Sequence, residues 1–164
     1  MEDRPKIQRV FLPNEKRTQV KNFIRAGFVG SNQMSCGSIL ELGERIQSFL
    51  NGEPVKFELD TIALEMCSTF QRRVLLAEYG IPRGWVSTYG RISKRLGIAK
   101  GARAVGRVLS RNPFPIIIPC HRAIRSDGQL GGFQGGLRMK KALLEHEGVS
   151  ISNEGKVLTT RIYY

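Results

Sequence analysis

Residues 87–113 constrain the fold more than any other part of the chain, because they predict two short helices across a tight turn. In the stretch STYGRISKRLGIAKGARAVGRVLSRNP, the serine or threonine at 87–88 can cap a first helix, which Gly97 ends. A second helix is expected from about residue 101 to residue 111, where the following Asn-Pro pair stops it. The sequence therefore predicts a helix-turn-helix.

The second of these helices carries a continuous basic stripe. Arg103, Arg107 and Arg111 recur at every fourth position, and no acidic residue lies within helical reach to pair with them. Such a stripe repels itself unless phosphate groups relieve the repulsion. Small residues such as Ala102 and Gly106 keep the helix slim, which suits entry into a nucleic-acid groove.

Charge is distributed unevenly along the chain, whose formal net charge is +12. Residues 1–69 hold 9 Lys and Arg against 9 Asp and Glu, whereas residues 70–164 hold 17 against 5. Between Arg83 and Arg125 there are ten basic residues and no acidic one. A solvated, solubilising surface would explain a short basic run. A one-signed stretch of this length favours a polyanionic partner instead, above all nucleic acid.

Length and composition are those of a globular protein. The 164 residues, 41% of them hydrophobic and 24% charged, suffice for one ordinary domain or two small ones. No apolar run approaches the roughly 20 residues of a membrane span, and the first ten residues show no signal-peptide core. We therefore expect a protein of the cytoplasm, or of the nucleus in a eukaryotic host, without membrane contact. Its three cysteines should be free thiols, with Cys36 and Cys67 buried as small hydrophobes.

Two domains and a tail are expected. Residues 1–65 read as an N-terminal α/β domain, and residues 69–149 as a C-terminal domain that holds the helix-turn-helix. Residues 150–164 form a C-terminal tail.

Further elements follow from the spacing of apolar residues. Short strands are predicted at 8–13 and 21–30, and a helix at 38–50 that an Asn-Gly pair stops. The C-terminal domain should begin with an amphipathic helix capped by Thr69 and close with a helix that ends at Gly148.

The segment PIIIPCHR, residues 115–122, ends an aliphatic run in a thiol, an imidazole and a cation. A reactive cysteine acts as a thiolate, which nearby positive charge or a hydrogen-bonded base favours. The nearby His121, Arg122 and Arg125 therefore predict that Cys120 is a nucleophile with a lowered pKa. Because adjacent side chains of a strand point to opposite sides, His121 should act at a turn or through a water.

Such a base needs an acid to orient it, and acids are few near the thiol. The candidates are Asp127, Glu145 and Glu147, and the last two point in different directions on one predicted helix, so only one should face the site. His146 is expected to be exposed or to cap that helix. Two histidines and three scattered cysteines show no ligand-like spacing, so no metal site is predicted.

A glycine cluster, GQLGGFQGG at residues 128–136, separates the thiol from the last helix. It reads either as a flexible loop or as the wall of a pocket. Glycines allow backbone to approach a flat ligand closely, and Phe133 offers a ring on which such a ligand would stack.

These motifs together resemble one family. PCHR preceded by NPFPIII, with ARAVG upstream and LLEHEG downstream, is similar to the methylated-DNA–protein-cysteine methyltransferases, also called O6-alkylguanine-DNA alkyltransferases. The resemblance is dense from about residue 70 to residue 149, half of the chain. It implies DNA repair by irreversible transfer of the O6-alkyl group of a flipped guanine to the protein's own cysteine, with O4-alkylthymine as a further candidate substrate. It implies no cofactor and a monomer that binds double-stranded DNA through the minor groove.

Roles for individual residues also follow from the resemblance. Cys120 is the implied acceptor, His121 its base through a water, Glu147 the acid that orients His121, and Asn112 the hinge between helix and active site. The implied DNA contacts are Tyr89, Ala102, Arg103, Gly106, Arg107, Arg111 and Arg122. The implied substrate pocket comprises Pro115, Gly131, Gly132, Phe133, Gln134 and Gly135.

Two of the implied DNA contacts have particular tasks in the family. Arg103 matches the arginine that fills the space of the flipped base, and Tyr89 the tyrosine that helps to rotate its phosphate. Phe133 stands where the family often has tyrosine, so a hydroxyl contact to the base is lost while stacking remains. For the fold, the resemblance implies a ribonuclease-H-like N-terminal α/β domain and a mainly α, winged-helix-like C-terminal domain.

Two alternatives remain open. One is a non-catalytic sensor of alkyl lesions, similar to the alkyltransferase-like proteins, which lack the acceptor cysteine that PCHR retains. The other is a regulatory winged-helix protein whose cysteine senses alkylation or redox state. That protein would need a recruiting or dimerising segment, and residues 1–65 show none.

Overall fold

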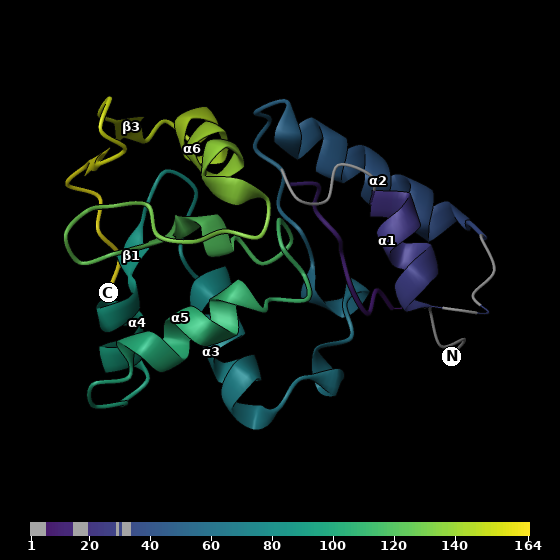
Figure 1. The fold of residues 1–164 in the computed structure, drawn as a ribbon, viewed down its shortest axis with the longest axis horizontal. Coiled ribbons are helices and arrows are strands. Elements are labelled where there is room, and N and C mark those ends of the chain that lie inside the picture. The colour runs from purple at the N-terminus through teal and green to yellow at the C-terminus, as the bar shows by residue number, and fades with distance from the viewer. Residues whose placement is uncertain (1–5, 15–19, 29, 31–33) are drawn as a thin grey trace.

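The structure, a computed structural model, describes residues 6–14, 20–28, 30 and 34–164. Helices α1 (Val20–Gly27) and α2 (Gly37–Leu50) lie on one side of the molecule (Figure 1). The one-turn 3-10 helices η1 (Leu59–Thr61) and η2 (Leu64–Met66) lead from them to the rest of the chain. The predicted helix at 38–50 is thereby confirmed.

The strands predicted for the N-terminal part are wrong. Residues 20–27 are helical, because Val20 and Ile24 recur at helical spacing in a run too short for periodicity alone to distinguish helix from strand. Residues 8–13 form no named strand, although the backbone beside them is paired: Ile7 N–H donates to Thr61 O (2.9 Å) and Val10 N–H to Pro113 O (2.8 Å).

The predicted helix-turn-helix is present as α4 (Tyr89–Arg95) and α5 (Ala102–Ser110), packed on α3 (Thr69–Tyr79). Thr88 caps α4 by accepting a hydrogen bond from Arg91 N (3.2 Å). The cap of α3 is Ser68 and not Thr69, since Ser68 Oγ accepts from Gln71 N (3.3 Å). Only glycine fits at position 101 in the turn, because a Cβ there would lie 2.5 Å from Ile98 Cγ2.

After α5 the chain runs through a buried segment into η3 (Cys120–Arg122) and β2 (Ala123–Ile124). β2 pairs in parallel with β1 (Ser87–Thr88), which directly precedes α4. This pairing fixes residues 113–123, the thiol segment, beside the helix-turn-helix. Helix α6 (Gly136–His146) and the antiparallel pair β3 (Ser150–Ile151) and β4 (Val157–Leu158) complete the fold (Figure 1).

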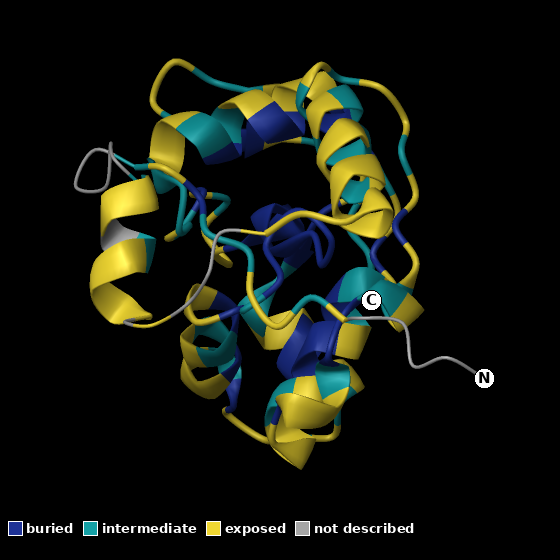
Figure 2. Cartoon of the chain, turned by 90° about the vertical axis from the view of Figure 1, so that its right-hand side faces the viewer, coloured by how far each residue is buried: buried dark blue, intermediate teal, exposed yellow. Residues whose placement is uncertain are grey.

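One hydrophobic core joins the N-terminal part to the C-terminal part, and the buried faces of the elements turn towards it (Figure 2). From the N-terminal part it includes Leu12, Phe49, Phe57 and Ile62, and from the C-terminal part Val74, Leu75, Ile92, Val105, Leu109 and Ile116–Ile118. The fold is thus a mixed helix and sheet fold in which helices dominate. Within the described ranges, no helix has the length and apolar character that a membrane crossing requires.

Candidate active site

Cys120 is only 4% exposed, yet it lines a cavity of about 810 Å³. Helices α4 and α5 supply one part of the lining and the glycine loop another. The lining residues are Tyr89, Gly90, Ala102, Arg103, Gly106, Leu109, Ser110, Cys120, Arg125, Ser126, Gly131, Gly132 and Phe133. The thiol is therefore buried in the protein yet open to a ligand in this cavity. The cavity lies between α5, the basic helix, and residues 128–136, the glycine loop.

The thiol is held in its protonated form. Burial raises the pKa of Cys120 to about 12, and a hydrogen bond from the Asn112 side chain only partly offsets that rise. The prediction of a lowered pKa for Cys120 is wrong. The neighbouring guanidinium of Arg122 does not stabilise a thiolate, because it is bound to Glu147 and to the carbonyl of Ile81. A nucleophilic Cys120 consequently needs a base to take its proton.

His121, Arg122 and Glu147 form a buried network next to the thiol. His121 Nε2 lies 2.9 Å from Glu147 Oε1. Arg122 grips the same carboxylate, with Nε 2.9 Å from Oε2 and Nη2 2.7 Å from Oε1, and its Nη1 donates to Ile81 O (2.6 Å). Because η3 is a tight helical turn, His121 and Arg122 both reach the residue that caps the end of α6.

The protonation states within this network follow from its contacts. Burial by itself would raise the pKa of Glu147, but the hydrogen bonds from His121 and Arg122 hold it at about 2. Burial lowers the pKa of His121 despite the neighbouring carboxylate. A neutral His121 therefore donates its Nε2–H to ionised Glu147, and the ion pair is the one between Glu147 and Arg122.

This arrangement leaves one atom of the imidazole free to act. Nδ1 of His121 is buried and has no hydrogen-bond partner within the described part of the chain. Since Nε2 carries the proton, Nδ1 presents a lone pair and can accept a proton. Of the candidate acids, Glu147 alone orients the histidine, whereas Glu145, Asp127 and also His146 are exposed, as predicted for His146.

Asn112 connects the end of α5 to the thiol segment. Its buried side chain accepts from Phe114 N (2.9 Å) and donates to Ile118 O (3.1 Å), while its own carbonyl accepts from Gln134 Nε2 (2.6 Å). These contacts join the helix, the segment before Cys120 and the glycine loop at one residue. The position fits the hinge role that the resemblance implies.

The residues expected to contact DNA fall into two groups. Tyr89, Ala102, Arg103 and Gly106 line the cavity beside Cys120. Arg107 and Arg111 are exposed and line, with Arg103, an adjoining groove of about 540 Å³ between α5 and the start of α3. The expectation for Arg122 needs correction, because its donors bind Glu147 and Ile81 and are not available to a phosphate.

The expected pocket residues also divide. Gly131, Gly132 and Phe133 line the cavity, whereas Pro115, Gln134 and Gly135 do not. Pro115 is buried, and Gln134 holds Asn112. At Gly135 a Cβ would lie 2.3 Å from Met139 Sδ, so a larger residue there would displace the Met139 side chain of α6.

Sequence reasoning missed two residues of the site's surroundings. Lys140 of α6 is buried, and its Nζ donates to Ala123 O (2.6 Å) and lies 3.4 Å from Gly132 O. Its helical spacing from Leu143 and Leu144 was a sign that it faces inward. Glu78 of α3 is also buried, and its helical spacing from Val74 and Leu75 was the corresponding sign.

A change at Gly131 is expected to harm both stability and the site. The residue has φ of 69°, and a Cβ there would lie 2.7 Å from the hydroxyl of Tyr89, so Gly131→Ala adds backbone strain and a clash. We expect Gly131→Ala to lose on the order of 1–3 kcal/mol of unfolding free energy in urea. Gly132→Ala is the control, because nothing lies within 4 Å of its Cβ position. Equal stability of the two variants would contradict this reading of the loop.

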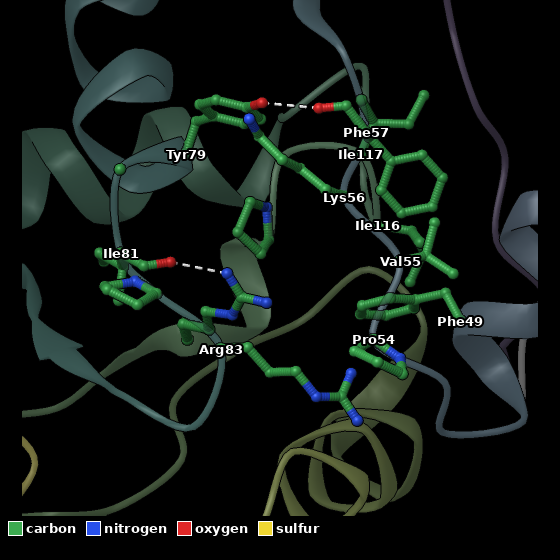
Figure 3. Close-up of a pocket in the computed structure, with 14 residues that line it drawn as sticks. Phe49, Pro54, Val55, Lys56, Phe57, Tyr79, Ile81, Arg83, Ile116 and Ile117 are labelled. Atoms are coloured by element: carbon green, nitrogen blue, oxygen red, sulfur yellow. Dashed lines mark hydrogen bonds between the residues drawn. The ribbon is translucent and has the colours of Figure 1, made fainter.

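A second, more apolar cavity of about 400 Å³ lies between the α2–η1 segment and the thiol segment (Figure 3). Phe49, Val55, Ile116 and Ile117 are among its walls, and it reaches Arg122 but not Cys120. The cavity that Cys120 lines is therefore the candidate site for chemistry.

The other two cysteines lie away from both cavities. Cys67 is buried as expected, but the expectation that Cys36 is buried is wrong, because Cys36 precedes α2 at the surface. Within the described residues, no cluster of three or more His, Cys, Asp or Glu side chains forms a set of metal ligands.

Comparison with known proteins agrees with this geometry. Residues 69–149 match the model of the DNA-binding domain of 6-O-methylguanine DNA methyltransferases. The chain is 47% identical over 117 residues to the methylated-DNA–protein-cysteine methyltransferase of Methanothermobacter thermautotrophicus, covering 71% of this chain and 65% of that protein. It is 41% identical over 124 residues to the protein of the same name from Mycobacterium leprae, covering 75% of this chain and 71% of that protein. The chain belongs to the methylated-DNA–protein-cysteine methyltransferase family.

A solved structure of this methyltransferase family is also similar. It is that of Mycobacterium tuberculosis OGT in complex with DNA, with a TM-score of 0.60 and 36% identity over 66% of each chain. The chain thus spans slightly less than two thirds of this structure and of the Methanothermobacter methyltransferase.

Proposed function

We propose that this protein repairs DNA by moving the alkyl group of O6-alkylguanine in double-stranded DNA irreversibly to Cys120. One observation carries the proposal. A free thiol lines a cavity between a basic helix and a glycine loop, and a neutral, oriented histidine follows it in the chain. The relatives are named for this reaction, and one was solved with DNA bound.

The chemistry requires few groups. His121 Nδ1 accepts the thiol proton of Cys120 through a water, and Glu147 stabilises the imidazolium that forms. The thiolate sulfur attacks the alkyl carbon, an S–C bond forms, and the C–O6 bond breaks. The departing guanine takes up one proton, so that guanine and an S-alkylcysteine are the products. No cofactor is consumed, and each molecule acts once.

DNA contact is assigned to α5 and its neighbours. Arg103 lines both the cavity and the exposed groove that Arg107 and Arg111 share, so it stands at the border between the DNA surface and the reaction site. That position suits a side chain that fills the space of a flipped base, while Tyr89 lines the cavity into which the base turns. Phosphate contacts by the exposed arginines make binding independent of sequence and sensitive to salt.

The finer architecture is part of the same proposal. A division into residues 1–65, 69–149 and 150–164 agrees with the span of the family model. A winged-helix-like C-terminal domain is supported by α3–α5 together with the short β pairs β1–β2 and β3–β4. A ribonuclease-H-like N-terminal domain has less support, because the described residues there form two α-helices, one 3-10 helix and no named strand. A monomer in the cytoplasm or nucleus completes the proposal.

Transfer is favoured over a non-catalytic sensor because Cys120 lines the cavity and is followed directly by a histidine whose Nδ1 has no partner among the described residues. The test is the intact mass of the protein after incubation with an excess of duplex oligonucleotide containing O6-methylguanine. We expect a gain of one CH2 unit per molecule, mapped to the peptide that carries Cys120. Cys120→Ser should bind the duplex and gain no mass, whereas Cys36→Ser should be modified like the wild type. An unmodified wild-type protein would refute the proposal.

A further inference from the structure

Glu78 is the most isolated buried acid in the described part of the chain. It lies near the end of α3 with 0% exposure, and neither carboxyl oxygen has a hydrogen-bond partner of normal geometry among the described residues, although the backbone of Ala123 interacts weakly with it. A buried carboxyl group without a donor is strongly disfavoured in its charged form. The proposed transfer reaction does not use it, so its presence calls for an explanation.

Lys140 is the second buried ionisable group that the proposed reaction leaves unused. It lies on α6 with 0% exposure, and its Nζ donates to Ala123 O (2.6 Å), the residue directly after η3. Gly132 O of the glycine loop lies 3.4 Å from the same nitrogen. The ammonium group is therefore anchored to the thiol segment and to the loop that walls the cavity.

Both groups act on Cys120 through their charge. Helix α3 packs against η3, which Cys120 begins, and α6 packs against the same turn. A charge on Glu78 raises the pKa of Cys120 and a charge on Lys140 lowers it, after the larger effects of burial and of the Asn112 hydrogen bond. The two groups thus have opposite effects on one thiol.

We propose that Glu78 and Lys140 are positioning residues that set the acidity of the Cys120 thiol with opposite signs. The proposal rests on the proposed function only in that Cys120 is the acceptor. The charged or titratable groups that interact with Glu78 come from each element around it: Cys120 and Arg122 of η3, Lys140 of α6, Tyr89 of α4 and Tyr164 of the C-terminal segment. The charge of Arg122 is neutralised by Glu147, so Lys140 is the counter-charge to Glu78.

The pair changes charge near neutral pH. Burial raises the pKa of Glu78 to about 8 and lowers the pKa of Lys140 to about 8. Below this pH Glu78 is neutral and Lys140 is charged, which favours the thiolate. Above it Glu78 is charged and Lys140 is neutral, which disfavours the thiolate. The acidity of Cys120 is therefore best supported below about pH 8.

The test is the rate of Cys120 alkylation by iodoacetamide at each pH from 6 to 10, read by mass spectrometry of the Cys120 peptide. Glu78→Gln is expected to raise this rate about tenfold above pH 8, where Glu78 carries its negative charge, and to leave it nearly unchanged well below pH 8. Lys140→Met is expected to lower the rate below pH 8, where Lys140 is charged. Rate changes of the same sign, or unchanged rates in both variants, would overturn the proposal.

Tyr79→Phe is the matched control. It removes a hydroxyl from the same helix, where Tyr79 Oη donates to Phe57 O (2.6 Å) on the side of the apolar cavity (Figure 3). Loosened packing in this control should change the rate of alkylation by the same factor at every pH. If Glu78→Gln does not fold, Glu78→Leu removes the same charge and must give the same rise in rate above pH 8.

Iodoacetamide requires no DNA, so this result is independent of the proposed function. A protein that fails to take a methyl group from DNA can still show the opposite changes in alkylation rate. Conversely, a protein that repairs DNA without these rate changes keeps its function and refutes the role of Glu78 and Lys140.

Discussion

Glu147→Gln is expected to slow alkyl transfer by about a hundredfold or more and to remove about 3 kcal/mol of stability at pH 7. The amide keeps the shape of the side chain but leaves the buried guanidinium of Arg122 without a counter-charge. It also no longer requires the proton of His121 to stay on Nε2, so Nδ1 ceases to be the fixed acceptor. Both effects come from one carboxylate that accepts from two side chains.

The stability loss should depend on pH with a defined sign. The pKa of Glu147 is about 2 in the folded protein, below its ordinary value of 4.5, so the native state favours the carboxylate. Its contribution is fully present above about pH 4.5 and is lost as the pH falls towards 2. The difference between wild type and Glu147→Gln in urea unfolding should therefore be constant near neutrality and shrink in acid.

Glu145→Gln is the control for this comparison. Glu145 lies on the same helix, is exposed, and pairs with Lys141 at 3.9 Å across one helical turn. Its replacement should change the free energy of unfolding by less than about 1 kcal/mol and leave the single-turnover rate as it is. A Glu147→Gln variant as active and as stable as this control would contradict the assigned roles of His121 and Glu147.

The fold was predictable where local signals agree. In residues 87–113 a threonine cap, turn glycines at 97 and 101 and an Asn-Pro stop coincide with apolar spacing, and the two helices form as expected. The short N-terminal runs lack such signals. In residues 6–14, Ile7 and Val10 pack against the core, and Ile7 also pairs with Ile62. Local sequence does not encode such tertiary contacts.

The identity of the site residues was easier to predict from the sequence than their pKa values. The histidine and its acid were foreseen, and the structure brings His121 and Glu147 into contact. Sequence adjacency gave the wrong sign for the pKa of Cys120, because η3 directs Arg122 to Glu147 while burial dominates the thiol. The helical spacing of Glu78 from Val74 and Leu75 was a sign of its burial, whereas its interaction with Lys140 depends on tertiary contacts and became visible only in the structure.

Glu78→Leu is expected to stabilise the protein, and more so as the pH rises from 5 to 8. Burial raises the pKa of Glu78 from 4.5 to about 8, so the folded protein keeps a proton that the unfolded chain releases. The contribution of this group is most favourable below about pH 4.5 and is lost as the pH rises through 8, a change on the order of 4 kcal/mol. Leucine, of similar volume and without a charge, removes this penalty.

Urea unfolding of the wild type and the variant at pH 5, 6, 7 and 8 measures the effect as a difference, so that other titrating groups such as His121 cancel. The titration of Lys140 adds little to the pH dependence of stability below pH 8, because Lys140 is mainly protonated there in both the folded and the unfolded state. Glu58→Leu, which replaces an exposed acid, should show no comparable growth with pH. A constant difference for Glu78→Leu would mean that Glu78 is charged and paired in the folded protein, and the opposite action of Glu78 and Lys140 on the thiol would then lose its physical basis.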